Sequence, residues 1–164
     1  MFIESEKMPG DSRIWIYQSN REFTVEEEQK IIVLGREFVE TWTAHNQELK
    51  ASIDIRNHLF LIIMIDQNYN LASGCSIDKS IHFILKLENI FSISLLDRQV
   101  FALKENNRIN LIRRREFEHM METGIINDDT IVYNNLIETK NELKNKWEIP
   151  LRESWHAAIR SKQR

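Results

Sequence analysis

Hydrophobic and polar positions alternate in several short stretches of the chain and recur at helical spacing in others. Short runs rich in β-branched and aromatic residues predict strands. These runs span residues 13–18, 51–56, 59–66, 99–104, 108–112 and 130–133. The run at 59–66 is apolar on both faces, so we expect it to be a central strand covered on each side.

Apolar residues at a period of three to four predict helices between these strands. Thr24 and Glu27 have the spacing of a capping box, and the apolar positions that follow, among them Trp42, His45 and Leu49, predict a helix to about residue 46. Further helices are expected after residue 73, over residues 113–123, and between residues 139 and 150.

The order of these elements predicts an α+β fold. The first six follow the βαββαβ order of a ferredoxin-like sheet, with a C-terminal strand and helices added. At 164 residues, 42% of them hydrophobic, the chain has the size of a single domain, residues 1–164. Residues 1–11 are charged and end in Pro9-Gly10, which indicates a flexible lead-in.

Composition narrows the choice of partners and compartment. A formal net charge of −3 makes duplex DNA and anionic membrane surfaces unlikely partners. The single cysteine and the absence of a secretory pattern at the N-terminus favour a reducing, cytoplasmic setting. The apolar run from Leu59 to Ile65 is far below the roughly 20 residues that a membrane-spanning helix needs.

The candidate chemistry is concentrated in an elbow at residues 73–80. Ser73, Gly74, Cys75, Ser76 and Asp78 lie where a strand is expected to give way to a helix. Small residues allow a sharp turn, and the positive end of a helix stabilises an anion or a thiolate. The alternative is that Ser76, Asp78 and Ser80 only cap the helix and that Cys75 is a small residue chosen for packing.

A cysteine-dependent enzyme would need a base beside Cys75, and His156 is the first choice, with His45 and His82 as others. Because pockets form at the ends of elements, we also expect at least two of three segments, those of Cys75, His156 and Asn134-Asn135, to line one cleft, with the asparagines as hydrogen-bond donors. No two histidines have H-x-x-x-H spacing, and the chain has no C-x-x-C motif. We therefore assign no metal site and no cofactor.

Aromatic residues suggest a second kind of site. Trp15 and Tyr17 share one face of the first strand, and an open face of this kind could bind single-stranded nucleic acid. In the alternative, helices cover that face. The run Arg113-Arg114-Arg115 places positive charges at the start of a helix, where they are unfavourable and invite an acidic partner.

Several segments resemble a family of small uncharacterised bacterial proteins, some of which carry the automatic description "ABC transporter ATPase". The resemblance covers nearly the whole chain and rests on residues 13–21, 73–78, 128–130 with 133–135, and 147–151 with 154–156, including the Ser73–Asp78 run and Ser154-Trp155-His156. It implies a single-domain bacterial protein of the cytosol and no known activity.

The ATPase description fails a chemical test. A P-loop needs G-x-x-x-x-G-K-[ST], and aligning it on Lys79-Ser80 puts Ser73 and Asp78 in the glycine positions, with a carboxylate beside the phosphates. We therefore expect a module that binds a small ligand or a protein, of unknown identity, with the cysteine enzyme and the nucleic-acid binder as alternatives. Assembly into a homo-oligomer stays open.

Overall fold

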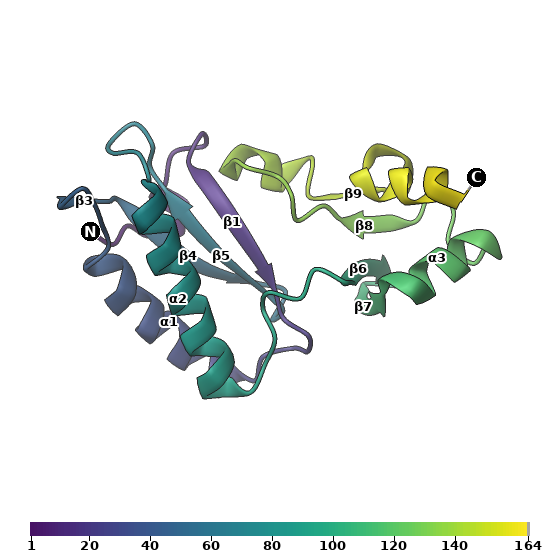
Figure 1. Ribbon diagram of the computed structural model, residues 1–164, viewed down its shortest axis with the longest axis horizontal. Coiled ribbons are helices and arrows are strands. Elements are labelled where there is room, and N and C mark those ends of the chain that lie inside the picture. The colour runs from purple at the N-terminus through teal and green to yellow at the C-terminus, as the bar shows by residue number, and fades with distance from the viewer. Residues whose placement is uncertain (164) are drawn as a thin grey trace. The chain divides into compact units, whose positions relative to one another are not determined.

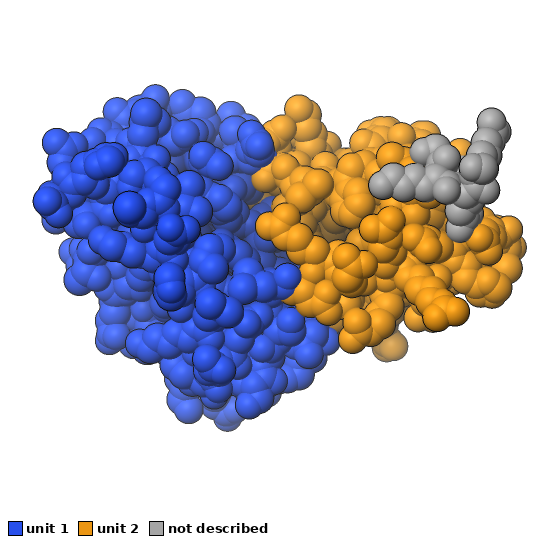
Figure 2. Space-filling view, in the orientation of Figure 1, with its two compact units in different colours: residues 1–96, 138–141 blue, residues 97–137, 142–164 orange. Residues whose placement is uncertain are grey.

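The computed structural model describes residues 1–163, and side chains as far as residue 159. The expected α+β class is confirmed. The chain divides into two compact units (Figure 2): unit 1 comprises Met1–Leu96 and Glu138–Asn141, and unit 2 comprises Asp97–Ile137 and Glu142–Arg164. Each unit has its own sheet and hydrophobic core. The expectation of one domain over residues 1–164 stays a prediction.

The main sheet of unit 1 is antiparallel and has three strands in the order β1-β5-β4 (Figure 1). The strands are β1 (Arg13–Gln18), β4 (Ala51–Arg56) and β5 (Phe60–Ile65). All six residues of β5 are buried, and β5 is the middle strand, which confirms the prediction from its continuous apolar run. The β4–β5 hairpin turns at Asn57 and His58, both at positive φ.

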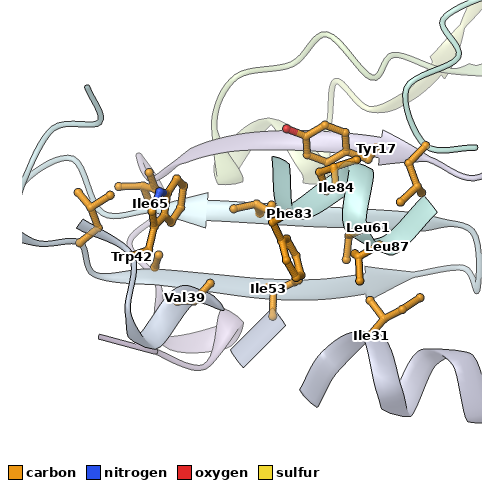
Figure 3. Packing of buried hydrophobic residues seen from close by; sticks show 14 of the residues in the cluster. Tyr17, Ile31, Val39, Trp42, Ile53, Leu61, Ile65, Phe83, Ile84 and Leu87 are labelled. Atoms are coloured by element: carbon orange, nitrogen blue, oxygen red, sulfur yellow. The ribbon is translucent and has the colours of Figure 1, made fainter. Parts of the chain in front are cut away.

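Helices α1 (Val25–Glu40) and α2 (Gly74–Phe91) pack on one face of this sheet. Figure 3 shows residues of both helices and of all three strands in a single core. Gly35 is required at the contact of α1 with β4, since a Cβ there would lie 2.3 Å from Cδ1 of Ile53.

The expected extension of α1 to residue 46 is wrong. The helix ends at Glu40, and the hydroxyl of Thr41 donates back to the carbonyl of Phe38 at 3.2 Å. The chain then forms a small hairpin of β2 (Thr43–Ala44) and β3 (Gln47–Glu48). His45 occupies its turn at φ 50° and is exposed, so it does not belong to a buried helical face.

Unit 1 follows the first five elements of the βαββαβ order, but the sixth does not complete its sheet. Strand β6 (Val100–Glu105) pairs on both sides within unit 2. The outer side of β1 is instead bridged by the returning segment 138–141: Arg13 pairs with Thr139, and the amide of Ile14 donates to the carbonyl of Glu138 at 2.9 Å.

The first residues of the chain also contact unit 1. Phe2 forms a parallel bridge with Ala51 of β4, Met8 is buried, and a short 3₁₀ turn covers Ser5–Lys7. The ammonium of Lys140 donates to the carbonyl of Met8 at 2.6 Å. Nothing in the hydrophobic pattern of residues 1–11 indicated these contacts.

The sheet of unit 2 is antiparallel, in the order β7-β6-β8-β9. Its other strands are β7 (Arg108–Arg113), β8 (Ile131–Tyr133) and β9 (Glu148–Pro150). Helix α3 (Arg114–Glu122) and the 3₁₀ segments Leu151–Glu153 and Trp155–Gln163 contribute to its core. The core residues of this unit include Phe101, Leu103, Ile112, Phe117, Val132 and Leu151.

The short helix expected between residues 139 and 150 forms only as a 3₁₀ helix over Lys140–Lys144, and the chain then extends into β9. The carbonyl of Trp147 accepts from the amide of Asn134 at 2.6 Å, so the main chain here pairs with the segment after β8 and is not available for helical bonds.

Candidate functional site

The elbow at residues 73–80 forms a well-capped start of α2. The hydroxyl of Ser73 accepts from the amide of Ser76 at 3.2 Å, and the hydroxyl of Ser76 accepts from the amide of Ser73 at 2.8 Å. Ser76 is fully buried, whereas Gly74 and Asp78 are exposed. Both serines are therefore occupied with capping the helix, a role that the alternative interpretation of the sequence gave to Ser76 but not to Ser73.

Cys75 is exposed in the first turn of α2. The histidine nearest in sequence, His82, donates from Nδ1 to the main-chain carbonyl of Asp78 at 2.8 Å, so that nitrogen is occupied within the helix. His156 belongs to unit 2 and Cys75 to unit 1. The cysteine–histidine pair therefore stays a prediction.

His156 is part of the core of unit 2. Its ring is 1% exposed, stacks on Trp155 with centroids 3.9 Å apart, and meets the ring of Phe101 edge-on at 4.9 Å. Its Nδ1 shares a hydrogen bond of 2.6 Å with the hydroxyl of Ser154. Burial lowers the pKa of His156 to about 4, so the ring is neutral near pH 7.

The two asparagines close the turn after β8. The side-chain oxygen of Asn134 accepts from the amide of Leu136 at 3.3 Å, and that of Asn135 accepts from the indole N–H of Trp147 at 2.9 Å. We expected both side chains to donate to a ligand, whereas these bonds use them as acceptors within the fold. Their sharing a cleft with Cys75 or His156 stays a prediction.

The aromatic face of β1 is covered. Tyr17 is 7% exposed and lies in the core of unit 1, and Trp15 packs against the same core with its ring 6.4 Å from that of Trp42. The guanidinium of Arg13 lies over the ring of Trp15, 4.8 Å from its centroid. The open aromatic face on which the nucleic-acid alternative depended is therefore not present.

The outer edge of β7 presents main-chain groups that the sequence did not identify. The β6–β7 hairpin turns at Asn106 and Asn107, both at positive φ, with Glu105 opposite Arg108. In such a two-residue hairpin the flanking pair is hydrogen-bonded, and bonded pairs then alternate along the ladder. The amide of Arg114 donates to the carbonyl of Gln99 at 2.8 Å, as this alternation requires.

It follows that the N–H and C=O groups of Ile109 and Leu111 point away from β6. Within residues 1–163, β7 has a neighbouring strand on one side only, and both residues are half-buried. The sequence predicted a strand at residues 108–112, but the strand order needed to identify an edge depends on pairings between distant residues.

Arginines lie at both ends of this edge. Arg108 and Arg113 are the first and last residues of β7, and Arg115 follows in the first turn of α3; all three are exposed. The edge therefore combines free main-chain hydrogen-bonding groups with positive charge.

Two features are absent from the part of the chain that the structure describes. In that part no three side chains of histidine, cysteine, aspartate or glutamate are grouped to hold a metal ion. No helix among those residues is long and apolar enough to cross a membrane. Comparison of the chain with protein-family models, curated proteins and solved structures gave no match.

Proposed function

We propose that this protein is a protein-binding module that accepts an extended segment of a partner as an additional strand beside β7. Strand addition uses the unpaired N–H and C=O groups of an edge strand for affinity and neighbouring side chains for specificity. The observation that carries the proposal is the outward direction of these groups at Ile109 and Leu111.

The other sheet edges are less suited to this role. The outer side of β1 is bridged at Arg13 by Thr139, and that of β4 is bridged at Ala51 by Phe2. Strand β9 has only three residues and ends at Pro150, which has no N–H to donate. Strand β7 has six residues and contains no proline.

The polar groups first considered for catalysis are hydrogen-bonded within the fold, so we propose binding and not catalysis. The hydroxyls of Ser73 and Ser76 cap α2, the Nδ1 of His156 is bonded to Ser154, and Asn134 and Asn135 form a turn. A catalytic constellation needs such groups to be directed at a substrate. A cytoplasmic, bacterial setting for this binding module is part of the proposal, and it rests on the single cysteine and on the family resemblance.

The test is a proline substitution at an outward position. Leu111→Pro removes an N–H that points away from β6, so the β6–β7 ladder keeps its hydrogen bonds while the outer edge is blocked. Leu111→Ala is the matched control, because it removes the side chain and keeps the N–H.

Peptides selected from a random display library on the wild-type protein provide the probe. We expect the selected peptides to bind Leu111→Pro at least about tenfold more weakly than Leu111→Ala, since both a hydrogen bond and the space for the added strand are lost. Selection of no peptide, or equal binding to both variants, would refute strand addition at β7.

A further inference from the structure

We infer that the segment accepted by β7 is acidic, with two carboxylates five positions apart that meet the arginines at the two ends of the strand. This inference rests on the proposed function and names the chemistry of its partner. It also accounts for the basic run at residues 113–115, which strand addition alone leaves unexplained.

Arg108 is available to a partner because its cross-strand neighbour is already occupied. Glu105 lies opposite Arg108, but its carboxylate accepts from the side-chain amide of Asn110 at 2.8 Å. Among the described side chains, no ion pair involves Arg108. An exposed guanidinium of this kind can bind a carboxylate through two parallel hydrogen bonds.

The other end of the strand carries more positive charge than unit 2 neutralises there. Arg113 is 3.7 Å from the carboxylate of Asp97, and its side chain is 74% exposed, so this ion pair contributes little. Arg114 pairs with Glu118 at 2.9 Å, whereas Arg115 has no ion pair among the described residues. A partner carboxylate here would meet both arginines.

The start of α3 adds to this preference for negative charge. Arg113 is the N-cap residue and makes no side-chain cap, and Glu116 is the one acidic residue of the first turn, beside the three arginines at 113–115. Cations in this position are unfavourable, and a carboxylate beside them relieves the repulsion.

The length of β7 sets the spacing of the carboxylates. Arg108 and Arg113 are five residues apart, or about 17 Å along a strand that rises about 3.4 Å per residue. A segment lying beside β7 would therefore present its acidic residues at positions i and i+5. β-Branched residues between them suit an extended conformation and the half-buried Ile109 and Leu111.

The same charges argue against a second copy of this chain as the added strand. In antiparallel pairing at this edge, residues whose main-chain groups point outward lie opposite each other, for example Ile109 of each copy opposite Leu111 of the other. Two edges that each carry Arg108, Arg113 and Arg115 would then lie side by side, and their like charges repel each other. The arginines thus favour an acidic partner and disfavour self-association at this edge.

Two labelled peptides test the inference: Glu-Val-Thr-Val-Thr-Glu and its uncharged counterpart Gln-Val-Thr-Val-Thr-Gln. We expect the acidic peptide to bind about 3- to 10-fold more tightly at low ionic strength, because two exposed ion pairs are gained. The difference should largely vanish in about 0.5 M salt, where such pairs are screened. Equal affinities at low salt would overturn the inference.

Charge variants locate the effect. Arg108→Gln combined with Arg113→Gln should remove the preference for the acidic peptide, whereas Lys79→Gln combined with Lys86→Gln should keep it. Both lysines are exposed on α2, and the second pair changes the net charge equally. A preference that survives the arginine changes would contradict the assignment to β7.

The proposed function and this inference fail in different ways. If both peptides bind equally and both are blocked by Leu111→Pro, strand addition stands and the acidic preference is wrong. If the acidic peptide binds Leu111→Pro as well as it binds Leu111→Ala, the arginines attract it without strand pairing, and the proposed function is wrong.

Discussion

Protonation of His156 should destabilise unit 2 in mildly acidic solution. The buried ring is neutral in the folded protein, and its pKa of about 4 lies below the ordinary histidine value of 6.5. Between these two pH values the unfolded chain binds one proton more than the folded chain, so stability falls as the pH falls. The slope is about 1.4 kcal/mol per pH unit, which amounts to about 3 kcal/mol between pH 6.5 and pH 4.

The variant His156→Phe isolates this contribution because it keeps an aromatic ring in the core and removes the titration. It leaves the hydroxyl of Ser154 without its partner, but that cost does not depend on pH. Ser154→Ala is the control, since it removes the same hydrogen bond and retains the titrating ring.

The assay is urea unfolding between pH 7 and pH 4, followed by methyl NMR signals of Leu103 and Val132, which belong to the core of unit 2. We expect the wild type and Ser154→Ala to lose about 3 kcal/mol more than His156→Phe over this range. Parallel pH profiles for all three proteins would show that protonation of this ring is not linked to folding.

Two other predictions concern unit 1. Gly35→Ala should lower the free energy of unfolding by about 1–3 kcal/mol in urea unfolding, because the added Cβ would lie 2.3 Å from Cδ1 of Ile53; a gain in stability, as expected for alanine in an unhindered helix, would contradict that packing. Cys75 should react with a thiol reagent in the folded protein without denaturant because it is exposed, and a thiol that reacts only after unfolding would show that it is buried.

Local sequence signals predicted the secondary structure where local forces determine it. The strands β1 and β4 have the expected bounds, and the Thr24–Glu27 capping box forms as predicted. Asn106 and Asn107, which lie between the expected strands at 99–104 and 108–112, tolerate the positive φ that a two-residue hairpin needs.

Predictions failed where contacts between distant segments decide the structure. Trp42 has the helical spacing of α1, yet its indole N–H donates to the carbonyl of Ser76 from a position beyond the end of the helix. The sixth expected element, β6, belongs to the sheet of unit 2 and not to that of unit 1. A local stretch of sequence indicates strand propensity, but it does not indicate which strands pair.

The sequence likewise indicated some features of the candidate site and not others. A capping role for Ser76 was one of the alternatives that the sequence offered, and the basic run at 113–115 indicated an acidic partner. The burial of His156 and the open side of β7 could not be derived, because each depends on which segments fold against it.

The most direct test of strand addition at β7 is amide hydrogen exchange, measured by NMR with and without the acidic peptide. The amides of Ile109 and Leu111 point outward, whereas those of Asn110 and Ile112 lie on the side bonded to β6. The account predicts that the peptide slows exchange at Ile109 and Leu111 and leaves Asn110 and Ile112 nearly unchanged. Binding without this alternating protection, or protection confined to other strands, would contradict it.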